Sequence, residues 1–502
     1  MADNTTSQIL DSKPSAQVQQ LDMIKLYYGA TTDKNTKNKQ DLGIEIEQDS
    51  ISEIYLTESI FGTLPKLRIK LFDNGEWATT FAFRAGTNIR LIITPRNGND
   101  DMIMAPILDC FFTLEGINYV MDQNASKYIY ELNCIYSCES FINKVCTWPE
   151  TDILQAAKSA ATNAIGLTKN DNPYKKTSKE VLEQLIGQTS LKFAYLPSKD
   201  PTDKMLWLNK TLSYAKFAKH IIDHAWLSEK DLPLLYINRN GQCFYDSLSR
   251  MTSQGIRGSY VFSTRYVNMK QKNLNENKND VVVKPYQDLS FVNIPFKAFN
   301  DGCAVQVSQY NPYNKDYIDK EKQKAQKVAD EEEISYRQIE FNGNGPYLAS
   351  VSNKSIKSVN LVNTRQYTGM YFKELHEYYN VAPLHHKNIR NSFFTNFCYM
   401  VLDMNEQFDT KENDPQAKKE DKENKKSYIN LGDKINIDVS DTKYKNRILS
   451  GDFIVSGLTH IWAPNTSYTI VVQGVNDGTN ETGYMDLYND MDKASNDSKK
   501  SR

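Results

Sequence analysis

Apolar and polar residues alternate in two parts of the chain, one near each end. The alternation covers residues 67–71 and 89–93, and it returns after residue 428 and runs to about residue 475. A period of two is typical of a strand that buries one face. We therefore expect antiparallel sheets at both ends of the chain.

The middle of the chain has a helical period instead. Residues 214–226 place their apolar side chains on one face, with Ser213 as the expected N-cap. Residues 234–237 and 243–248 then flank a turn that contains Gly241, and the Asn-Gly pair there suits a tight hairpin. A mixed α/β unit is expected between the two strand-rich ends.

These patterns predict a mainly β protein with α+β insertions, in which a mixed α/β middle section separates two tube-like antiparallel β-barrel domains. The arm at the N-terminus is polar apart from one short apolar anchor at residues 23–28. The expected segments are a flexible N-terminal arm over 1–42, a first tube-like β-barrel domain over 43–140, a mixed α+β inserted domain over 141–285, a connecting β-rich section with a charged helix over 286–384, a second tube-like β-barrel domain over 385–476 with a charged insertion at 409–427, and a polar C-terminal tail over 477–502.

Composition narrows the class of protein. The 502 residues carry 60 Lys and Arg against 62 Asp and Glu, so the net charge of -2 argues against a chain whose overall field gathers nucleic acid. No apolar run approaches the ~18–20 residues of a membrane-spanning helix, and the first 20 residues lack the apolar region of a secretory signal. We expect a chain that is made in the cytoplasm, without membrane anchoring.

Three blocks of sequence recur in the same order at the two ends. Residues 86–93 and 432–439 share Gly-x-x-Ile-x-aliphatic-x-aliphatic, and residues 112–119 and 453–460 share Phe followed four positions later by Gly. A Tyr opens the third block in each copy. The matched positions are Gly86, Ile89, Leu91, Phe112, Gly116 and Tyr128 in the first copy, and Gly432, Ile435, Ile437, Phe453, Gly457 and Tyr468 in the second.

We interpret the blocks as an internal duplication of a small antiparallel barrel. Gly86 and Gly432 end a turn, and Gly116 and Gly457 permit a bulge or a close backbone approach inside a strand. Short aliphatic strands with glycine also resemble one another by chance, because alternation is common in β proteins. If the duplication is real, a closed trimer would present six similar barrels in a ring.

The two ends resemble the baseplate or tail hub proteins of bacteriophage tails and related contractile injection machines. The run 51–61, followed by 67–73 and the strand after Gly86, is similar to the opening of these hubs, and the run 449–460 with residues 475–478 is similar to their closing strands. The likeness covers about 200 residues. The long insertion at 409–427 and the large middle section depart from the family pattern.

The resemblance implies a structural protein of the virion tail or baseplate, made in the host cytoplasm. It implies a homotrimer whose paired barrels form a pseudo-sixfold ring. One side of the ring would stack on the hexameric tail tube protein, and the other would hold a trimeric central spike or tip protein beside other baseplate proteins. The tape-measure protein and DNA would pass through the channel.

Candidate metal ligands are few. His220 and His224 have the i, i+4 spacing of a chelating pair, but no Glu follows His220 and the pair fits a solvated helix face. The seven cysteines are an odd set, which favours reduced core thiols over disulfides; Cys134, Cys138 and Cys146 would make only part of a zinc site. We expect no metal and no cofactor.

Catalytic motifs are also missing from the sequence. It contains neither a phosphate-binding loop of the Gly-x-x-x-x-Gly-Lys type nor a Gly-x-Ser-x-Gly elbow. His385 and His386 are expected just before a strand at residues 391–402, where neighbours point to opposite faces and cannot share a ligand. We therefore expect no enzymatic activity and no catalytic residues. The alternative is a hub-like tail-tip enzyme that degrades cell-wall peptidoglycan, for which 62 acidic residues supply many carboxylate pairs.

Overall fold

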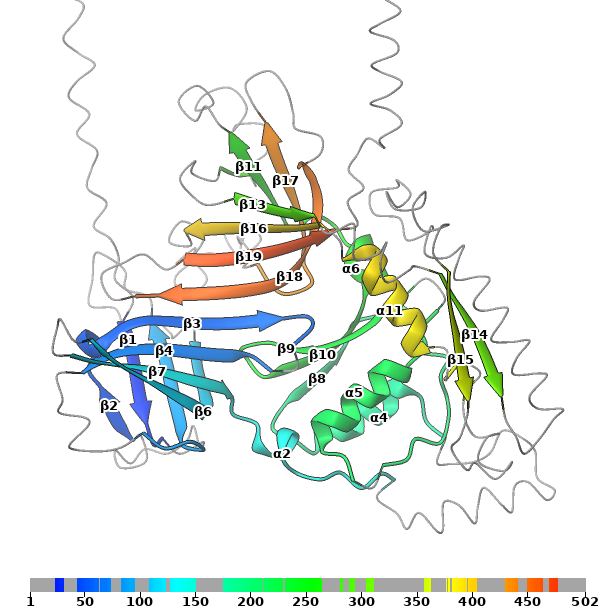
Figure 1. The fold of residues 1–502 in the computed structure, drawn as a ribbon, viewed down its shortest axis with the longest axis horizontal. Coiled ribbons are helices and arrows are strands. Elements are labelled where there is room, and N and C mark those ends of the chain that lie inside the picture. The colour runs from blue at the N-terminus through cyan, green and yellow to red at the C-terminus, as the bar shows by residue number, and fades with distance from the viewer. Residues whose placement is uncertain are drawn as a thin grey trace, which may run out of the picture.

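A computed structural model gives the fold of the chain (Figure 1). It describes residues 23–30, 43–62, 64–73, 83–94, 108–122, 127–149, 175–209, 211–228, 231–263, 280–282, 289–293, 304–310, 356–362, 376, 378–379, 382–394, 396–403, 429–440, 449–463 and 469–476.

The N-terminal part forms an antiparallel sheet, called here the first sheet. In spatial order its strands are β3 (Ile51–Ser59), β4 (Lys66–Asp73), β7 (Lys127–Tyr136), β6 (Leu108–Asp122), β5 (Asn88–Thr94), β1 (Met23–Tyr28) and β2 (Ile44–Ile46). A short 3-10 helix, η2 (Gln48–Ser50), precedes β3. In β4 the alternating residues Leu67, Ile69 and Leu71 are buried, as expected from the sequence, because they face the core.

The C-terminal part forms a second sheet. Its strands, in spatial order, are β13 (Leu289–Asn293), β16 (Asn396–Asp403), β19 (Thr469–Asn476), β18 (Gly451–Trp462) and β17 (Lys434–Ser440), followed by the parallel strands β11 (Gly258–Ser263) and β12 (Asp280–Val282). β18 also pairs with β3, so both sheets belong to one 14-stranded sheet within the described residues. Figure 1 shows the orange and red strands of the second sheet above the blue and cyan strands of the first.

The described part of the chain is therefore mainly β, with a curled antiparallel sheet of half-barrel form. The buried apolar residues of both sheets form one core, which includes Phe112 from the first sheet and Phe453 from the second. β1 comes from the segment expected to be an arm, and it joins the sheet because Ile24 and Leu26 bury against β5. β13 comes from the expected connecting section and pairs with β16.

A mixed α/β unit, called here the middle unit, has its own core. Its elements are α2 (Glu139–Ile142), α4 (Ser178–Gly187), β8 (Lys192–Tyr195), α5 (Tyr214–His224), β9 (Pro233–Ile237), β10 (Gln242–Ser247) and α6 (Leu248–Ser253). Helix α4 begins at a capping box formed by Thr177 and Glu180. Helix α5 buries the predicted apolar face, and Ser213 is its N-cap residue without a side-chain capping bond.

The predicted hairpin of the middle unit is confirmed. β9 and β10 pair antiparallel, and Gly241 in their turn has φ 73°. Two further elements are a parallel pair, β14 (Ala304–Tyr310) and β15 (Ile356–Val362), and helix α11 (Ala382–Phe393), which contacts α5.

Some expected features lie outside the described residues: the charged helix within 286–384, the insertion at 409–427 and the tail at 477–502. Among the described residues, no helix is both long and apolar enough to cross a bilayer.

Candidate assembly interface

Each sheet contains a turn that holds a glycine in the left-handed conformation. Gly86 has φ 82° and Gly432 has φ 78°, values that favour glycine. The amide of Gly86 donates to the carbonyl of Leu114 at 2.7 Å, and the amide of Gly432 donates to the carbonyl of Val455 at 2.8 Å. In return, the amide of Leu114 donates to the carbonyl of Thr87, and the amide of Val455 donates to the carbonyl of Asp433, both at 2.9 Å. The two turns therefore have the same hydrogen bonds.

A bulge interrupts the longest strand of each sheet at a corresponding place. Between β6 and β7 the register shifts between Leu114 and Gly116, and between β18 and β19 it shifts between Val455 and Gly457. A bulge bends the strand and increases its local twist. In both sheets the glycine comes directly after the bulge, and its strand continues beyond it.

The strand order is also the same. The first sheet runs β3-β4-β7-β6-β5 and the second runs β13-β16-β19-β18-β17, and every neighbouring pair in both is antiparallel. The flanking strands differ, because β1 is antiparallel to β5 whereas β11 is parallel to β17. The five-strand order is thus common to both sheets, and the sixth strand is not.

Most of the repeat positions noted in the sequence lie within the described residues. The aliphatic and Phe positions are all buried: Ile89, Leu91, Phe112, Ile435, Ile437 and Phe453. Ile89 pairs with Phe112, and Ile435 pairs with Phe453. Tyr128 is 38% exposed near the start of β7, and Tyr468 lies outside the described residues.

The two bulged strands differ in what lies beside them. After its bulge β18 pairs with β3, from Gly457 opposite Ser59 to Trp462 opposite Ile54. This pairing is called here the seam. After its bulge β6 pairs on one side with β7, and among the described residues no strand covers its other side.

Side-chain exposure agrees with this difference. A Cβ on Gly457 would meet Gln473 Oε1 at 2.8 Å and the carbonyl of Glu58 at 3.5 Å, whereas a Cβ on Gly116 would meet nothing within 4 Å. Tyr119, on β6 beyond the bulge, is 62% exposed. β13 likewise has a single partner, β16, among the described residues. An edge of this kind is a template for another strand.

A buried ionic cluster lies in the seam. Glu58 of β3 is 1% exposed, and its Oε2 lies 2.8 Å from Arg239 Nη1 and 2.9 Å from His460 Nε2. Glu58 Oε1 accepts from the backbone amide of Arg239, in the β9–β10 turn. His460 stacks on Trp462, with ring centroids 5.6 Å apart. The cluster, called here the seam cluster, therefore joins the first sheet, the second sheet and the middle unit.

The charges in the seam cluster are set by these contacts. Burial would raise the pKa of Glu58, but attraction to Arg239 and the hydrogen bond from His460 outweigh it and lower this pKa to about 2. Burial lowers the pKa of His460, against the opposing effect of Glu58. The carboxylate is thus ionised and can only accept, which places the imidazole proton on His460 Nε2.

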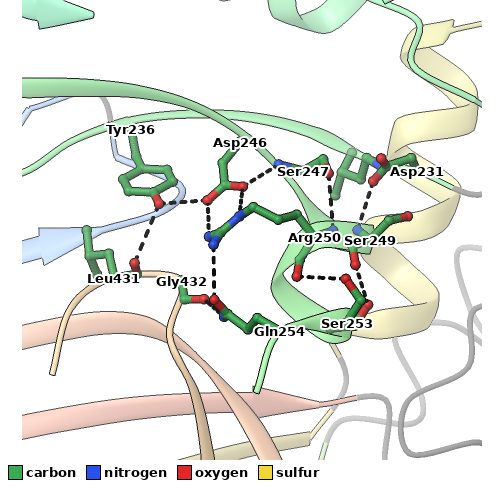
Figure 2. A network of polar contacts seen from close by, with 12 residues as sticks. Asp231, Tyr236, Asp246, Ser247, Ser249, Arg250, Ser253, Gln254, Leu431 and Gly432 are labelled. Carbon is green, nitrogen blue, oxygen red and sulfur yellow. Dashed lines mark hydrogen bonds and ion pairs between the residues drawn. The ribbon is translucent and has the colours of Figure 1, made fainter. Parts of the chain in front are cut away.

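A second polar network fixes the Gly432 turn to the middle unit (Figure 2). The fully buried Asp246 accepts from Arg250 Nη2 at 2.6 Å and from the Tyr236 hydroxyl at 2.9 Å. Gln254 donates through Nε2 to the carbonyl of Gly432. A Cβ on Gly432 would lie 3.1 Å from the Tyr236 hydroxyl and 3.4 Å from Arg250 Nη2. At the other turn the Tyr28 hydroxyl bonds to Thr87 and Arg84, but a Cβ on Gly86 itself would meet nothing within 4 Å among the described residues.

The candidate metal ligands have other partners. The rings of His220 and His224 lie 4.6 Å apart on α5. The hydroxyl of Tyr379 lies 3.2 Å from His220 Nε2, and its carbonyl lies 2.8 Å from His224 Nδ1. In the part of the chain that the structure describes, no group of three His, Cys, Asp or Glu residues could hold a metal ion.

The expectation for His385 and His386 was wrong. Both lie inside helix α11, not before a strand, and the strand β16 begins later, at Asn396. Both side chains are buried, and His385 contacts Trp226 with ring centroids 4.9 Å apart. Helix α11 contacts α5, and its apolar residues Ile389 and Phe393 are buried in the core of the two sheets, which the interpretation of this segment as a strand did not detect.

Sequence reasoning missed the seam cluster. One local signal was present: Glu58 continues the alternation of Ile54 and Leu56, so a charged residue occupies a position on the buried face of β3. A charge at such a position requires a partner. Nothing near Glu58 in sequence names that partner, because Arg239 and His460 are 181 and 402 residues away.

Comparisons with known proteins give structural likenesses only. No protein-family model matches the chain, and no curated protein matches it. The chain is similar to the 43 kDa tail protein of prophage MuSo2 from Shewanella oneidensis, with 8% identity, a TM-score of 0.44, and 91% and 97% of the two chains covered. It is also similar to a tail protein from Neisseria meningitidis MC58, with 6% identity, a TM-score of 0.43, and 91% and 97% covered.

A third likeness is to an Escherichia coli protein described as a component of the type VI secretion system with structural similarity to T4 bacteriophage tail proteins. Its identity is 7% and its TM-score is 0.32, with 87% of this chain and 75% of that chain covered. At these scores the likenesses carry no argument about function.

Proposed function

We propose that this protein is a structural hub of a phage-type tail or baseplate, in which three copies form a pseudo-sixfold ring. The observation that carries the proposal is the shared strand order, bulge and turn of the two sheets. Equivalent sheets in one chain allow a trimer to present six similar units. The sequence resemblance of the two ends to tail hubs points the same way.

The proposed contact between copies follows from the seam. If the two sheets are equivalent, β13 corresponds to β3, and β6 after Gly116 corresponds to β18 after Gly457. The seam pairs β3 with β18 inside one chain. The open edge of β13 would then pair with the open edge of β6 in a second copy, and three such contacts close a ring without free edges.

The seam also supplies the register of this contact. Thr57 pairs with Thr459 in the seam. We match Gly116 with Gly457, the glycines that follow the two bulges, and extend the match from strand to strand through the paired residues of each sheet. Val292 then corresponds to Thr57, and Asn118 corresponds to Thr459. Val292 of one copy would therefore lie opposite Asn118 of the next copy.

The same pairing gives a wall of suitable size. Within one chain the eight strands β13-β16-β19-β18-β3-β4-β7-β6 form a continuous antiparallel run. Three such runs, closed into one wall, would have a backbone circumference of about 115 Å at ~4.8 Å per strand, and so a backbone diameter of about 37 Å. A channel of this order admits a DNA duplex.

The face of this run that points away from the core has mixed charge. Lys70 lies 2.7 Å from Glu53, and Arg68 lies 3.7 Å from Glu131. Arg68 also lies over the ring of Tyr55, at 4.4 Å. Cations paired in this way do not form a Lys/Arg stripe, so a polymer of phosphates would pass without strong binding. We therefore propose that this face lines a channel for DNA, between the hexameric tail tube and a trimeric spike or tip.

Disulfide trapping tests the ring. Asn118→Cys together with Val292→Cys should yield a covalent trimer on a non-reducing gel when assembled particles are oxidised. Each single variant serves as a control and should yield no trimer. Monomers alone from the double variant, in particles that still assemble, would reject the ring. A cell-wall zymogram of the same protein is expected to show no clearing, since the proposed role includes no catalytic step.

A further inference from the structure

The strand β3 has two possible partners, the edges of β18 and β6. β3 and β13 occupy equivalent places in the strand order, as do β18 and β6. Their backbone groups alone would allow β3 to pair with β6, as well as with β18. A chain that made this error would join first sheets to one another and leave the second sheets unpaired. Side chains must therefore distinguish the two edges.

The seam cluster is placed to make this distinction. Glu58 lies opposite Leu458 and diagonal to His460, on the buried side of the seam. Its charge is compensated by Arg239 at 2.8 Å and by His460 at 2.9 Å. The β9–β10 turn that carries Arg239 is itself held to the first sheet, because Cys110 Sγ donates to the carbonyl of Arg239 at 2.8 Å.

The other edge lacks a counterpart of His460, the hydrogen-bond donor that β18 supplies to Glu58. By the same register, β6 has Ile117 in the place of Leu458 and Tyr119 in the place of His460. If β3 paired with β6, the Glu58 carboxylate would keep Arg239 but lose the hydrogen bond from His460, and it would lie between an aliphatic residue and a tyrosine. A buried carboxylate that loses one of its hydrogen-bond donors is disfavoured. β13 carries Asn293 in the place of Glu58, so it brings no charge to β6.

We propose that the seam cluster is the specificity element that directs β3 to β18 of its own chain and excludes β3 from the β6 edge. Glu58 is the discriminating group, and His460, which β18 supplies, favours the correct seam. This inference rests on the equivalence of the two sheets that the proposed function assumes. It goes beyond that function because it states how correct and incorrect strand pairs are separated.

Two pairs of engineered cysteines report which edge β3 has joined. Thr57→Cys with Thr459→Cys reports the correct seam, because the two threonine hydroxyls lie 3.4 Å apart on its exposed side. Thr57→Cys with Asn118→Cys reports the incorrect pairing of β3 with β6. In the otherwise unchanged protein, oxidation should link the first pair within one chain and should link the second pair no more than the single variants do.

The test exchanges the residues of the two edges. Glu58→Asn with His460→Tyr gives β3 and β18 the residues found on β13 and β6, and it should raise the yield of the Thr57–Asn118 reporter at least tenfold. Tyr119→Lys is a surface variant that leaves the seam unchanged and offers a cation on β6, and it should raise the same reporter several-fold. The matched control is Glu53→Gln, on the exposed face of β3, which should change neither reporter.

An unchanged Thr57–Asn118 yield in both the exchange variant and Tyr119→Lys would overturn the inference. If the exchange variant does not fold, as judged by circular dichroism, Tyr119→Lys alone decides. This outcome is independent of the test of the ring, which measures the disulfide between Asn118→Cys and Val292→Cys. Loss of the covalent trimer with a normal response of the Thr57 reporters would reject the ring and keep the role of Glu58.

Discussion

The carboxylate of Glu58 and the imidazole of His460 lie 2.9 Å apart across the seam, although 402 residues separate them in sequence. They belong to strands of different sheets, and both side chains are buried. The contact can form only after the two ends of the chain have come together. Its loss should therefore affect the joining of the sheets more than the folding of either sheet.

The first prediction concerns acid stability at this contact. The pKa of Glu58, about 2 in the folded chain, lies below its unfolded value, so the stabilisation is complete above about pH 4.5 and is lost as the pH falls through about 2. The difference amounts to about 3 kcal/mol. Glu58→Gln should therefore lower the urea midpoint at pH 7 and flatten its dependence on pH below 4.5. An equal loss at pH 7 and pH 2 would contradict this assignment.

The second prediction compares two glycines whose turns have the same backbone hydrogen bonds. Gly86→Ala should cost only the strain of a left-handed alanine, about 1 kcal/mol, because its Cβ would meet nothing within 4 Å. Gly432→Ala should cost more, because its Cβ would lie 3.0 Å from Met251 Cε and 3.1 Å from the Tyr236 hydroxyl. Thermal unfolding of the two variants measures the difference. A larger loss for Gly86→Ala would show that the turn at Gly432 is not held as described.

The strands were largely predictable from sequence. In β4 and β5 the buried positions follow the period of two, because each strand has one face on the core. Helix α5 was predictable for the corresponding reason, since its apolar residues share one face. The Asn-Gly pair likewise predicted the turn at Gly241, where the backbone has a positive φ that glycine adopts readily.

Partners between distant segments were not predictable in this way. The pairing of β3 with β18 and the contact of Arg239 with Glu58 depend on how the middle unit folds, and no local pattern encodes this. Helix α11 was missed because its polar residues, His385 and His386 among them, are buried against α5 and Trp226 instead of facing solvent. Tertiary packing overrides local preference in such segments.

The third prediction concerns the network in Figure 2. Asp246→Asn removes the charge that faces Arg250. Asp246 is fully buried, and its Oδ2 lies 2.6 Å from Arg250 Nη2. Breaking one partner of a buried ion pair should cost about 3 kcal/mol. The control is Asp200→Asn, since Asp200 is 75% exposed beside Lys179 and should cost less than about 1 kcal/mol. Similar losses for the two variants would argue against this role of Asp246.

The fourth prediction concerns the thiols. The six cysteines within the described residues are all buried, and burial raises the pKa of Cys134, Cys243 and Cys398. Buried neutral thiols react slowly. Ellman's reagent at pH 8 should therefore modify none of these six thiols quickly in the native protein; the seventh, Cys303, lies outside the described residues. In urea all seven should react, and fast modification of two or more native thiols would conflict with this packing.

The last prediction concerns mild acid and the junction between α5 and α11. Burial lowers the pKa of His376 to about 4. The hydrogen bond to the backbone of His224 raises this pKa in part, and repulsion from the His224 side chain lowers it further. Burial also lowers the pKa of His386. Both groups bind protons more tightly in the unfolded chain, so stability present above about pH 6.5 is lost as the pH falls.

For His376 alone the loss should reach about 2 kcal/mol at pH 5. Tryptophan fluorescence can follow it, because the His376 ring lies 6.4 Å from the ring of Trp207. His376→Asn should reduce the difference between the unfolding midpoints at pH 7 and pH 5, whereas Lys219→Gln on the exposed face of α5 should leave that difference unchanged. If His376→Asn keeps the full acid sensitivity of the parent chain, the titrating groups lie elsewhere and the junction is not the acid-labile part of the fold.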